Sequence, residues 1–334
     1  MERTSGMRWT RVAAAAFAAL QLTACAGDAS APRELTFGHV GEPGSLFALS
    51  ADEFASRANE RLPAGWSVHT YGSSQLGGDE VLLQKIKLGT VDFALPSSVM
   101  SSQIDEFGLF EMPYLVRDRA HMRAIERDVV WPDLAPLAEA QGYRIIGVWE
   151  NGFRQVTNNI RPITSPADLA GVKLRTPSGV WRVKLFQALG ANPTPMALSE
   201  VFVALQTGVI DGQENPLAQI WGSKLYEVQT YLSLTGHVYT PAYVVVSPSR
   251  WDALPEDVRT ILEEEARGVQ AYVHEIAERL DSELVGQMRT AGVEVNQPDP
   301  AAFLAASRGV YEEFAQSVPG GQALVDRAMA AGSN

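Results

Sequence analysis

The chain has 334 residues, of which 27 are Lys or Arg and 39 are Asp or Glu, so its formal net charge is −12. This acidic balance argues against a basic face for nucleic acid, and it means that a bound anion must meet locally focused positive charge. A single cysteine excludes an internal disulfide bond.

The first 24 residues are typical of an export signal. Arg3, Arg8 and Arg11 give the chain a basic start, and an apolar, mostly alanine run follows at 12–22. That run is shorter than the roughly 20 apolar residues of a membrane-spanning helix, and it has the length of the apolar core of a secretory signal peptide. We therefore exclude residues 1–24 from the fold. Because they hold three arginines and one glutamate, removing them brings the formal charge to −14.

A lipid-attachment motif ends the apolar run. The tetrapeptide Leu22-Thr23-Ala24-Cys25 resembles the bacterial lipobox, in which the cysteine thiol receives a diacylglycerol and the peptide is cut just before it. The alternative is an ordinary signal peptide cut near Ala24 or Ala26, with Cys25 incidental. We predict lipidation of Cys25, which would hold the protein to a membrane by a lipid anchor, in the periplasm or elsewhere outside the cytoplasm.

Strand-like and helix-like segments alternate along the first half of the chain. The pattern predicts strands at 34–40, 66–71, 91–95 and 143–149, and helices at 46–62 and 81–88. Such alternation is typical of parallel α/β layers. The pattern restarts with a strand at 172–175 and helices at 180–189 and 199–207, and a β-branched strand at 239–246 is expected to return to the first sheet.

Two domains are expected, because about 310 residues exceed what a single core usually supports. We place the first domain at 33–151 plus 240–282 and the second at 152–239 plus 283–334.

One long helix is predicted in the last quarter of the chain. Apolar residues recur at spacings of three and four from Pro255 to about Thr290. At 1.5 Å per residue this helix could reach ~50 Å, long enough to touch both domains. Gly268 is the place where it could bend.

The sequence offers little for catalysis. It has no G-x-S-x-G elbow, no phosphate-binding glycine loop and no C-x-x-C pair. The five histidines are scattered, and Glu278 stands where a zinc helix beginning at His274-Glu275 would need its second histidine. We therefore predict a binding protein rather than an enzyme, with neither a metal nor another cofactor.

Two arginines are candidates for a binding site. Arg154 follows the predicted strand that ends at Trp149, and Arg175 ends the strand at 172–175. Ligands of open α/β sheets bind beyond the carboxyl ends of strands, so both side chains are expected to face one cleft. A guanidinium matches both oxygens of a carboxylate and stays charged. The alternative for each arginine is an exposed position or a structural salt bridge.

Longer motifs are shared with one protein family. They include A-N-P-T-P-M at 191–196, S-E-V at 199–201, A-L-Q-T-G at 204–208, D-G-Q-E-N-P at 211–216, S-S-Q-L-G at 73–77, G-F-R-Q at 152–155 and K-L-R-T-P at 173–177. This chain thus resembles the DctP family, the solute-binding proteins of TRAP (tripartite ATP-independent periplasmic) transporters. The resemblance runs from about residue 35 to the end and is densest between 150 and 245.

The resemblance implies an α/β, periplasmic-binding-protein-like fold of two domains, with a hinge, a central cleft and one long domain-spanning helix. It implies that Arg175 clamps the carboxylate of an organic acid by a two-pronged salt bridge, supported by Asn215 and Arg154. It also implies delivery of that acid to a permease of one large and one small integral-membrane subunit, driven by an ion gradient.

Further ligand contacts are expected from loops of the first domain and from the neighbourhood of Arg175. These residues are His39, Glu42, Ser97, Ser98, Ser178, Trp181 and Leu198. Trp181 and Leu198 could equally well belong to the core.

The sequence leaves the ligand open among dicarboxylates, sugar acids, hydroxy or keto acids and ectoine-like compounds. Two other functions remain as alternatives at this point. One is a ligand-binding receptor of a different transporter or of a sensor, and the other is an extracytoplasmic enzyme that acts on organic acids.

Overall fold

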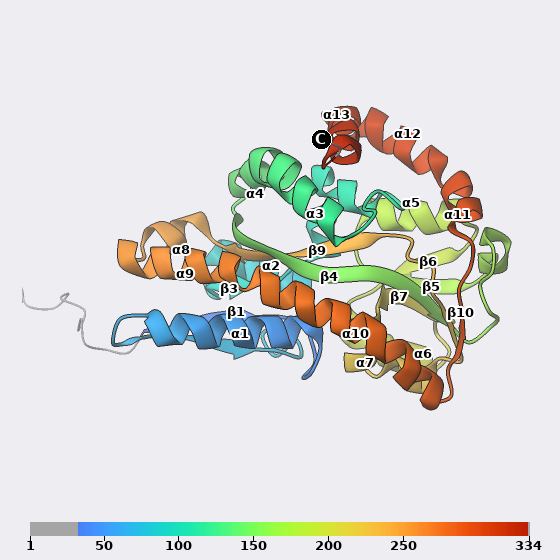
Figure 1. Cartoon of the computed structure of the whole chain (residues 1–334), viewed down its shortest axis with the longest axis horizontal. Coiled ribbons are helices and arrows are strands. Elements are labelled where there is room, and N and C mark those ends of the chain that lie inside the picture. Colours follow the sequence, from blue (N-terminus) through green and yellow to red (C-terminus); the bar gives the residue numbers. More distant parts are fainter. Residues whose placement is uncertain (1–32, 333–334) are drawn as a thin grey trace, which may run out of the picture.

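The computed structural model describes residues 33–332, which form a mixed β-sheet with helices packed around it (Figure 1). The predicted signal segment and Cys25 lie outside the described residues. None of the helices in the described range is both long and apolar enough to cross a membrane.

Within the described residues the sheet has ten strands. They are β1 (Arg33–Gly38), β2 (Trp66–Tyr71), β3 (Phe93–Ala94), β4 (Arg144–Asn158), β5 (Lys173–Thr176), β6 (Asn192–Pro195), β7 (Gly212–Pro216), β8 (Tyr231–Ser233), β9 (Tyr239–Val246) and β10 (Glu294–Asn296). The strand order is β2-β1-β3-β9-β4-β7-β5-β6, while β8 pairs with β4 and β10 pairs with β8.

Helices and short helical turns connect these strands. The α-helices are α1 (Leu46–Arg61), α2 (Asp79–Leu88), α3 (Arg119–Ile125), α4 (Ala135–Ala140), α5 (Val180–Ala188), α6 (Leu198–Gln206), α7 (Leu217–Gly222), α8 (Pro248–Asp252), α9 (Glu256–Gly268), α10 (Gln270–Thr290), α11 (Pro300–Ala306), α12 (Arg308–Ser317) and α13 (Gly321–Ala330). The other helical segments are η1 (Ser98–Ser102), η2 (Asp105–Glu111), η3 (Glu126–Leu134), η4 (Pro166–Leu169) and η5 (Leu225–Val228).

The long antiparallel pair β4 and β9 runs through the middle of the molecule (Figure 1). On one side β9 pairs with β3, which is parallel to β1, and on the other side β4 pairs with β7, which is parallel to β5. The expectation of parallel layers is therefore correct only within each half. The strands β4 and β9 pass between the two halves in opposite directions, so they pair antiparallel.

Local signals explain where the first helices begin and end. Ser45 caps α1 by accepting a hydrogen bond from the amide of Ala48 at 3.3 Å. Gly89 ends α2 in the left-handed conformation at φ 67°, which glycine adopts without steric cost. Each signal lies directly beside the helix end that it sets, so the sequence pattern predicted both helices to within two residues at either end.

The predicted long helix is two helices with a short break. Helix α9 ends at Gly268 and α10 starts at Gln270, so the break falls beside the glycine at which a bend was expected. The carbonyl of Ala266 lies in the last turn of α9 and accepts a hydrogen bond from the indole nitrogen of Trp149 at 2.7 Å. Helix α10 continues diagonally past β4 and α7 to the far half of the molecule (Figure 1).

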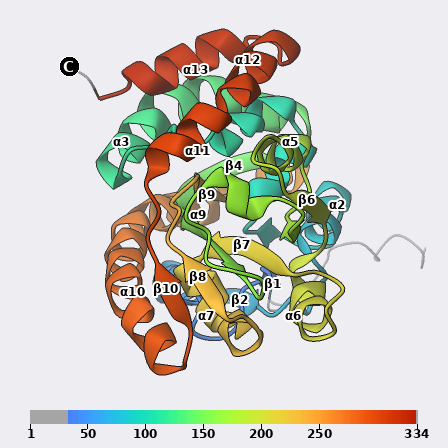
Figure 2. The same cartoon turned by 90° about the vertical axis from the view of Figure 1, so that its right-hand side faces the viewer.

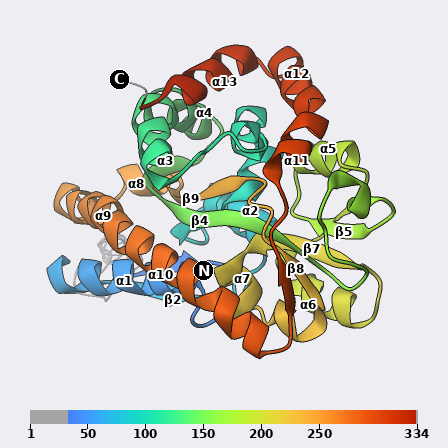
Figure 3. The same ribbon diagram turned by 45° about the vertical axis from the view of Figure 1, so that its right-hand side comes forward.

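The last three helices close over the outer side of the molecule, and the sequence pattern did not predict them. Helix α12 packs against α5, and α13 packs against η2 and η3. Figures 2 and 3 show α12 and α13 beside the helices of residues 98–140, far from them in the chain. The C-terminal segment thus covers elements that belong to the first half of the sequence.

Candidate binding cleft

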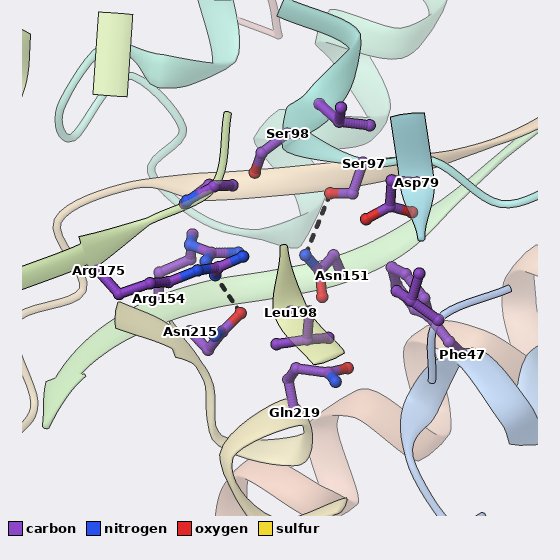
Figure 4. A pocket seen from close by; sticks show the side chains of 13 residues that line it. Phe47, Asp79, Ser97, Ser98, Asn151, Arg154, Arg175, Leu198, Asn215 and Gln219 are labelled. Carbon is purple, nitrogen blue, oxygen red and sulfur yellow. Dashed lines mark hydrogen bonds between the residues drawn. The ribbon is translucent and has the colours of Figure 1, made fainter. Parts of the chain in front are cut away.

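A cavity lies between the two halves and is lined by strands, helix ends and loops of both (Figure 4). The space between its walls is about 370 Å³, a figure that includes its open mouth. One half contributes Val40, Phe47, Asp79, Ser97, Ser98, Val99 and Asn151, and the other contributes Arg154, Arg175, Pro177, Leu198, Asn215 and Gln219.

Arg175 is held in place by the backbone around it. It lies on β5 with 4% of its surface exposed, and its Nε and Nη2 donate to the carbonyl of Met196 at 2.9 and 2.6 Å. Its Nη1 has no hydrogen-bond partner among the described residues and is free to meet a ligand. Burial, and next the charge of Arg154, lower the pKa of Arg175 to about 10, so it remains a cation at neutral pH.

Arg154 lies beside Arg175 and is oriented by the strand β7. Its Nε donates to Oε2 of Glu214 at 2.5 Å and its Nη2 donates to Oε1 of Glu214 at 3.0 Å. The same Nη2 donates to Oδ1 of Asn215 at 2.9 Å (Figure 4). Strand order β4-β7-β5 places these side chains on three adjacent strands.

A hydrogen-bond chain fixes the amide of Asn215. Its Nδ2 donates to Oε1 of Gln213 at 2.5 Å, and Nε2 of Gln213 donates to the hydroxyl of Thr157 at 2.8 Å. Since Oδ1 of Asn215 accepts from Arg154, the amide cannot flip without losing both bonds. Its second Nδ2 hydrogen remains as a further donor at the cavity.

Glu214 is the centre of a buried charge network. Besides Arg154, it accepts from Nη1 of Arg182 at 2.6 Å and lies 3.0 Å from Nε2 of His237. Burial acts to raise its pKa, but Arg154 and Arg182 outweigh burial and hold that pKa well below the usual range. Nε of Arg182 in turn donates to Oε2 of Glu111 at 2.5 Å.

The wall opposite the arginines carries serines and an asparagine. Nδ2 of Asn151 donates to the Oγ of Ser97 at 3.1 Å, and Ser97 donates to the carbonyl of Pro241 at 2.7 Å (Figure 4). The Oγ of Ser98 is buried without a hydrogen-bond partner within the described residues. Both serines were expected at the ligand, and both line the cavity.

Asp79 is a lining residue that the sequence analysis missed. It is the first residue of α2, and its Oδ1 is buried in the described structure without a hydrogen-bond partner. Figure 4 shows its carboxyl across the cavity from Arg175. Burial, and then the nearby Glu80, raise its pKa to about 7, although Arg175 opposes this. The predicted helix began at residue 81, so Asp79 appeared to be an ordinary loop residue.

Four expected contacts lie away from the cavity lining. Trp181 packs edge-on against Phe314 at 5.1 Å, with its ring against Gly108, so it is part of the core. His39 is buried beside Gly72, and Ser178 does not line the cavity. Glu42 accepts from the hydroxyl of Ser73 at 2.7 Å and borders an outer groove that adjoins the main cavity at Val40 and Leu198.

The cleft is suited to holding a carboxylate. Within the described residues, Nη1 of Arg175 and Nη1 of Arg154 donate to no protein group, and the second hydrogen of Asn215 Nδ2 lies near them. Among residues 33–332 there is no group of three His, Cys, Asp or Glu side chains that could hold a metal ion. Charge-assisted hydrogen bonds from guanidinium groups are the strongest protein contacts that a carboxylate can receive.

Comparison with known proteins identifies a family. Residues 37–317 match the family model of bacterial extracellular solute-binding protein, family 7, named DctP. The 2,3-diketo-L-gulonate-binding periplasmic protein YiaO of Escherichia coli is 32% identical over 91% of this chain and 94% of its own length.

Solved structures show the same fold. A TRAP periplasmic solute-binding protein from a Polaromonas species, bound to D-erythronate, has a TM-score of 0.86 and 30% identity, over 90% of this chain and 99% of its own. Another from Sulfurospirillum deleyianum, with bound succinate, has a TM-score of 0.85 and 30% identity over the same shares of the two chains. The fold is therefore that of the two-domain TRAP solute-binding proteins.

Proposed function

This chain belongs to the bacterial extracellular solute-binding proteins, family 7, and we propose that its cleft holds the carboxylate of a small organic acid between Arg175, Arg154 and Asn215. Proteins of this family are solute receptors of TRAP transporters. The protein is accordingly an extracytoplasmic receptor that binds an organic acid and delivers it to a membrane permease. The acids named for relatives and solved neighbours include 2,3-diketo-L-gulonate, D-erythronate and succinate.

The arrangement around Arg175 is the observation that supports this assignment of residues. In a protein of net charge −12, two guanidinium groups lie side by side in the cavity, each with an unused Nη1. A structural salt bridge would have placed a carboxylate against Arg175, but its protein partner is the carbonyl of Met196. A ligand carboxylate would supply the missing negative charge.

Domain closure would complete the site. With domains at 33–151 plus 240–282 and 152–239 plus 283–334, Asp79, Ser97 and Ser98 come from one domain and the clamp from the other. Closing excludes water and strengthens the pair between guanidinium and carboxylate. The two walls can contact the ligand together only when the domains are closed, so closure contributes to selectivity.

A thermal-shift screen of the purified protein against a library of organic acids tests this function. A ligand at 100 times its Kd adds roughly 2.7 kcal/mol of stability, which gives a readily measured increase in melting temperature. We expect stabilisation by small carboxylates and none by their amides or alcohols. If no acid in the library stabilises the protein, or if the amides do so equally well, the proposed function is wrong.

We also propose that Cys25 carries a lipid anchor, which would keep the receptor near a large and a small integral-membrane permease subunit. The support is the sequence Leu22-Thr23-Ala24-Cys25 after the apolar run. A single chain gives only marginal membrane binding, so the attached group must carry two or more.

The variant Cys25→Ser should lose the modification and leave the membrane fraction. Labelling with a radioactive fatty acid and fractionation of a lipoprotein-competent host measure both effects. Ala26→Ser, one residue further on, is the matched control and should still be labelled. Labelling of the Cys25→Ser protein at the wild-type level would contradict the proposal.

A further inference from the structure

The charges on the side chains buried around Arg175, Arg154 and Asn215 do not sum to zero. Three guanidinium groups, those of Arg154, Arg175 and Arg182, and two carboxylates, those of Glu111 and Glu214, are each 4% exposed or less. Burial lowers the pKa of the adjoining His237, so its imidazole is counted as neutral. Burial raises the pKa of Glu111, but its ion pair with Arg182 at 2.5 Å opposes this, and Glu111 is counted as a carboxylate. With Asp79 protonated, the state that a bound carboxylate favours, the cluster therefore carries one excess positive charge.

Glu111 and Arg182 contribute to that balance without lining the main cavity. Oε2 of Glu111 accepts from Nε of Arg182, whose Nη1 reaches Glu214 at 2.6 Å, while its Nη2 is buried without a partner in the described structure. Glu111 also lines a small pocket that adjoins the main cavity at Ser97 and Ser98. Its charge thus lies just behind the wall that a ligand would touch.

A buried excess charge is costly, and a ligand that neutralises it binds best. One carboxylate brings this cluster to neutrality. A second carboxylate would have no buried cation left to pair with, and the wall facing the arginines carries Asp79 rather than a basic residue. In the absence of Glu111 the cluster would carry two excess positive charges and would suit a dianion.

Building on the proposed function, we infer that the buried Glu111–Arg182 pair sets the charge of the site and thereby makes the receptor select acids with one carboxylate over dicarboxylates. Glu111 acts through Arg182 and the field in the cleft, and it does not touch the ligand. It is thus a specificity-determining residue outside the clamp.

Matched pairs of acids test the inference. D-erythronate and meso-tartrate share a four-carbon skeleton and differ only in whether the last carbon is a hydroxymethyl group or a carboxylate, and 4-hydroxybutanoate and succinate form a second such pair. Calorimetry gives the ratio of the two Kd values in each pair. Wild-type protein should bind the monocarboxylate more tightly in each pair that binds.

The variant Glu111→Gln keeps the size of the side chain and removes its charge. It should shift the Kd ratio about tenfold toward the dicarboxylate, the size expected for one charge acting across a protein interior. Asp105→Asn removes an exposed charge from the same segment η2 and should leave the ratio unchanged. The double variant Glu111→Gln/Arg182→Met restores one excess positive charge and should return the ratio to within threefold of wild type.

Three outcomes would overturn the inference. They are a wild-type preference for the dicarboxylates, a ratio that Glu111→Gln leaves within twofold of wild type, and failure of all four acids to bind. In the first two cases carboxylates still bind, so the proposed function stands and only the charge selection fails. Circular dichroism and the melting temperature of each variant show whether it is folded.

Discussion

At the scale of single residues, the site is built before a ligand arrives. Arg175 is oriented by the Met196 carbonyl, and Arg154 is oriented by Glu214 and Asn215. A side chain that is already held in its binding geometry loses less conformational entropy when the ligand binds. Arg154 also stabilises the fold, because removing it would leave Glu214 short of a partner in the interior. Arg175, whose protein partner is a carbonyl, is the cleaner probe of binding.

Arg175→Lys keeps the charge but loses the planar fork, so one of two parallel hydrogen bonds to a carboxylate should be lost. A charge-assisted hydrogen bond contributes about 1.5–3 kcal/mol, so Kd should rise roughly ten- to a hundredfold. Arg175→Ala should raise Kd further, because it removes both the fork and the charge. Calorimetry with a ligand from the screen measures this, and Lys173→Ala, an exposed cation on the same strand, is the control. An Arg175→Ala protein that is folded and binds within threefold of wild type would rule out the clamp.

Asp79 predicts how binding depends on pH. Its pKa of about 7 leaves it half ionised near neutrality, and a bound carboxylate raises that pKa further. Binding of an organic acid therefore takes up a proton at Asp79, and affinity falls as pH rises through 7. Between pH 6 and pH 8 the loss should approach about tenfold. In Asp79→Asn the affinity should be nearly constant over this range, and an equal pH dependence in the variant would assign the effect to another group.

At the scale of elements, the break between α9 and α10 is coupled to the central strand β4. The last carbonyls of a helix need partners outside it, and the indole of Trp149 on β4 supplies one at Ala266. A second contact comes from Gln270, the first residue of α10, whose Nε2 donates to the carbonyl of Val148 at 2.8 Å. The long helix pair is thereby fixed to the strand that crosses both halves.

Trp149→Phe tests this link, since it keeps most of the aromatic packing and removes only the indole donor. The Ala266 carbonyl would be left buried without that partner, at a cost of about 1–3 kcal/mol. Urea denaturation should show that Trp149→Phe lowers the free energy of unfolding by this amount more than Trp251→Phe does. Trp251 is also buried, but no hydrogen bond of its indole is seen in residues 33–332, so it is the matched control. Equal losses in the two variants would show that the hydrogen bond contributes nothing measurable.

At the scale of the whole molecule, the two halves meet closely at a glycine. A Cβ placed on Gly222, at the end of α7, would lie 2.9 Å from the Cβ of Ser45, the residue that caps α1. Real Cβ atoms do not approach so closely, so the contact requires a residue without a side chain. Ser45 and Gly222 belong to different proposed domains, and this contact forms part of the seam between them.

Gly222→Val should hold the domains apart and weaken ligand binding without unfolding either half. Small-angle scattering of wild-type protein should show a smaller radius of gyration with saturating ligand than without. The variant should bind more weakly and stay expanded at the same ligand concentration. Gly286→Val is the control, because Gly286 is also helical but faces open space. If wild type does not contract with ligand, a rigid pocket replaces the closure mechanism.

The local pattern of the sequence was enough to predict much of this molecule. Strand 239–246 and helix 46–62 follow from residue spacing and caps within a few positions, and Arg175 lies near the end of its strand as expected. The strand predicted at 143–149 instead continues to Asn158, so Arg154 lies within β4 and not beyond its end. The motifs around 191–216 identified the family. All of these depend on neighbours along the chain, where the sequence carries the physical information directly.

Only the tertiary structure decided which of the polar residues share the cleft. Asp79 becomes a lining residue because α2 begins two residues earlier than its apolar pattern suggests, and Trp181 is core because Phe314, far along the chain, packs on it. The pairing of Glu111 with Arg182 joins segments 71 residues apart. Burial and charge pairing depend on contacts between distant segments, and no local spacing encodes which distant partner a side chain will meet.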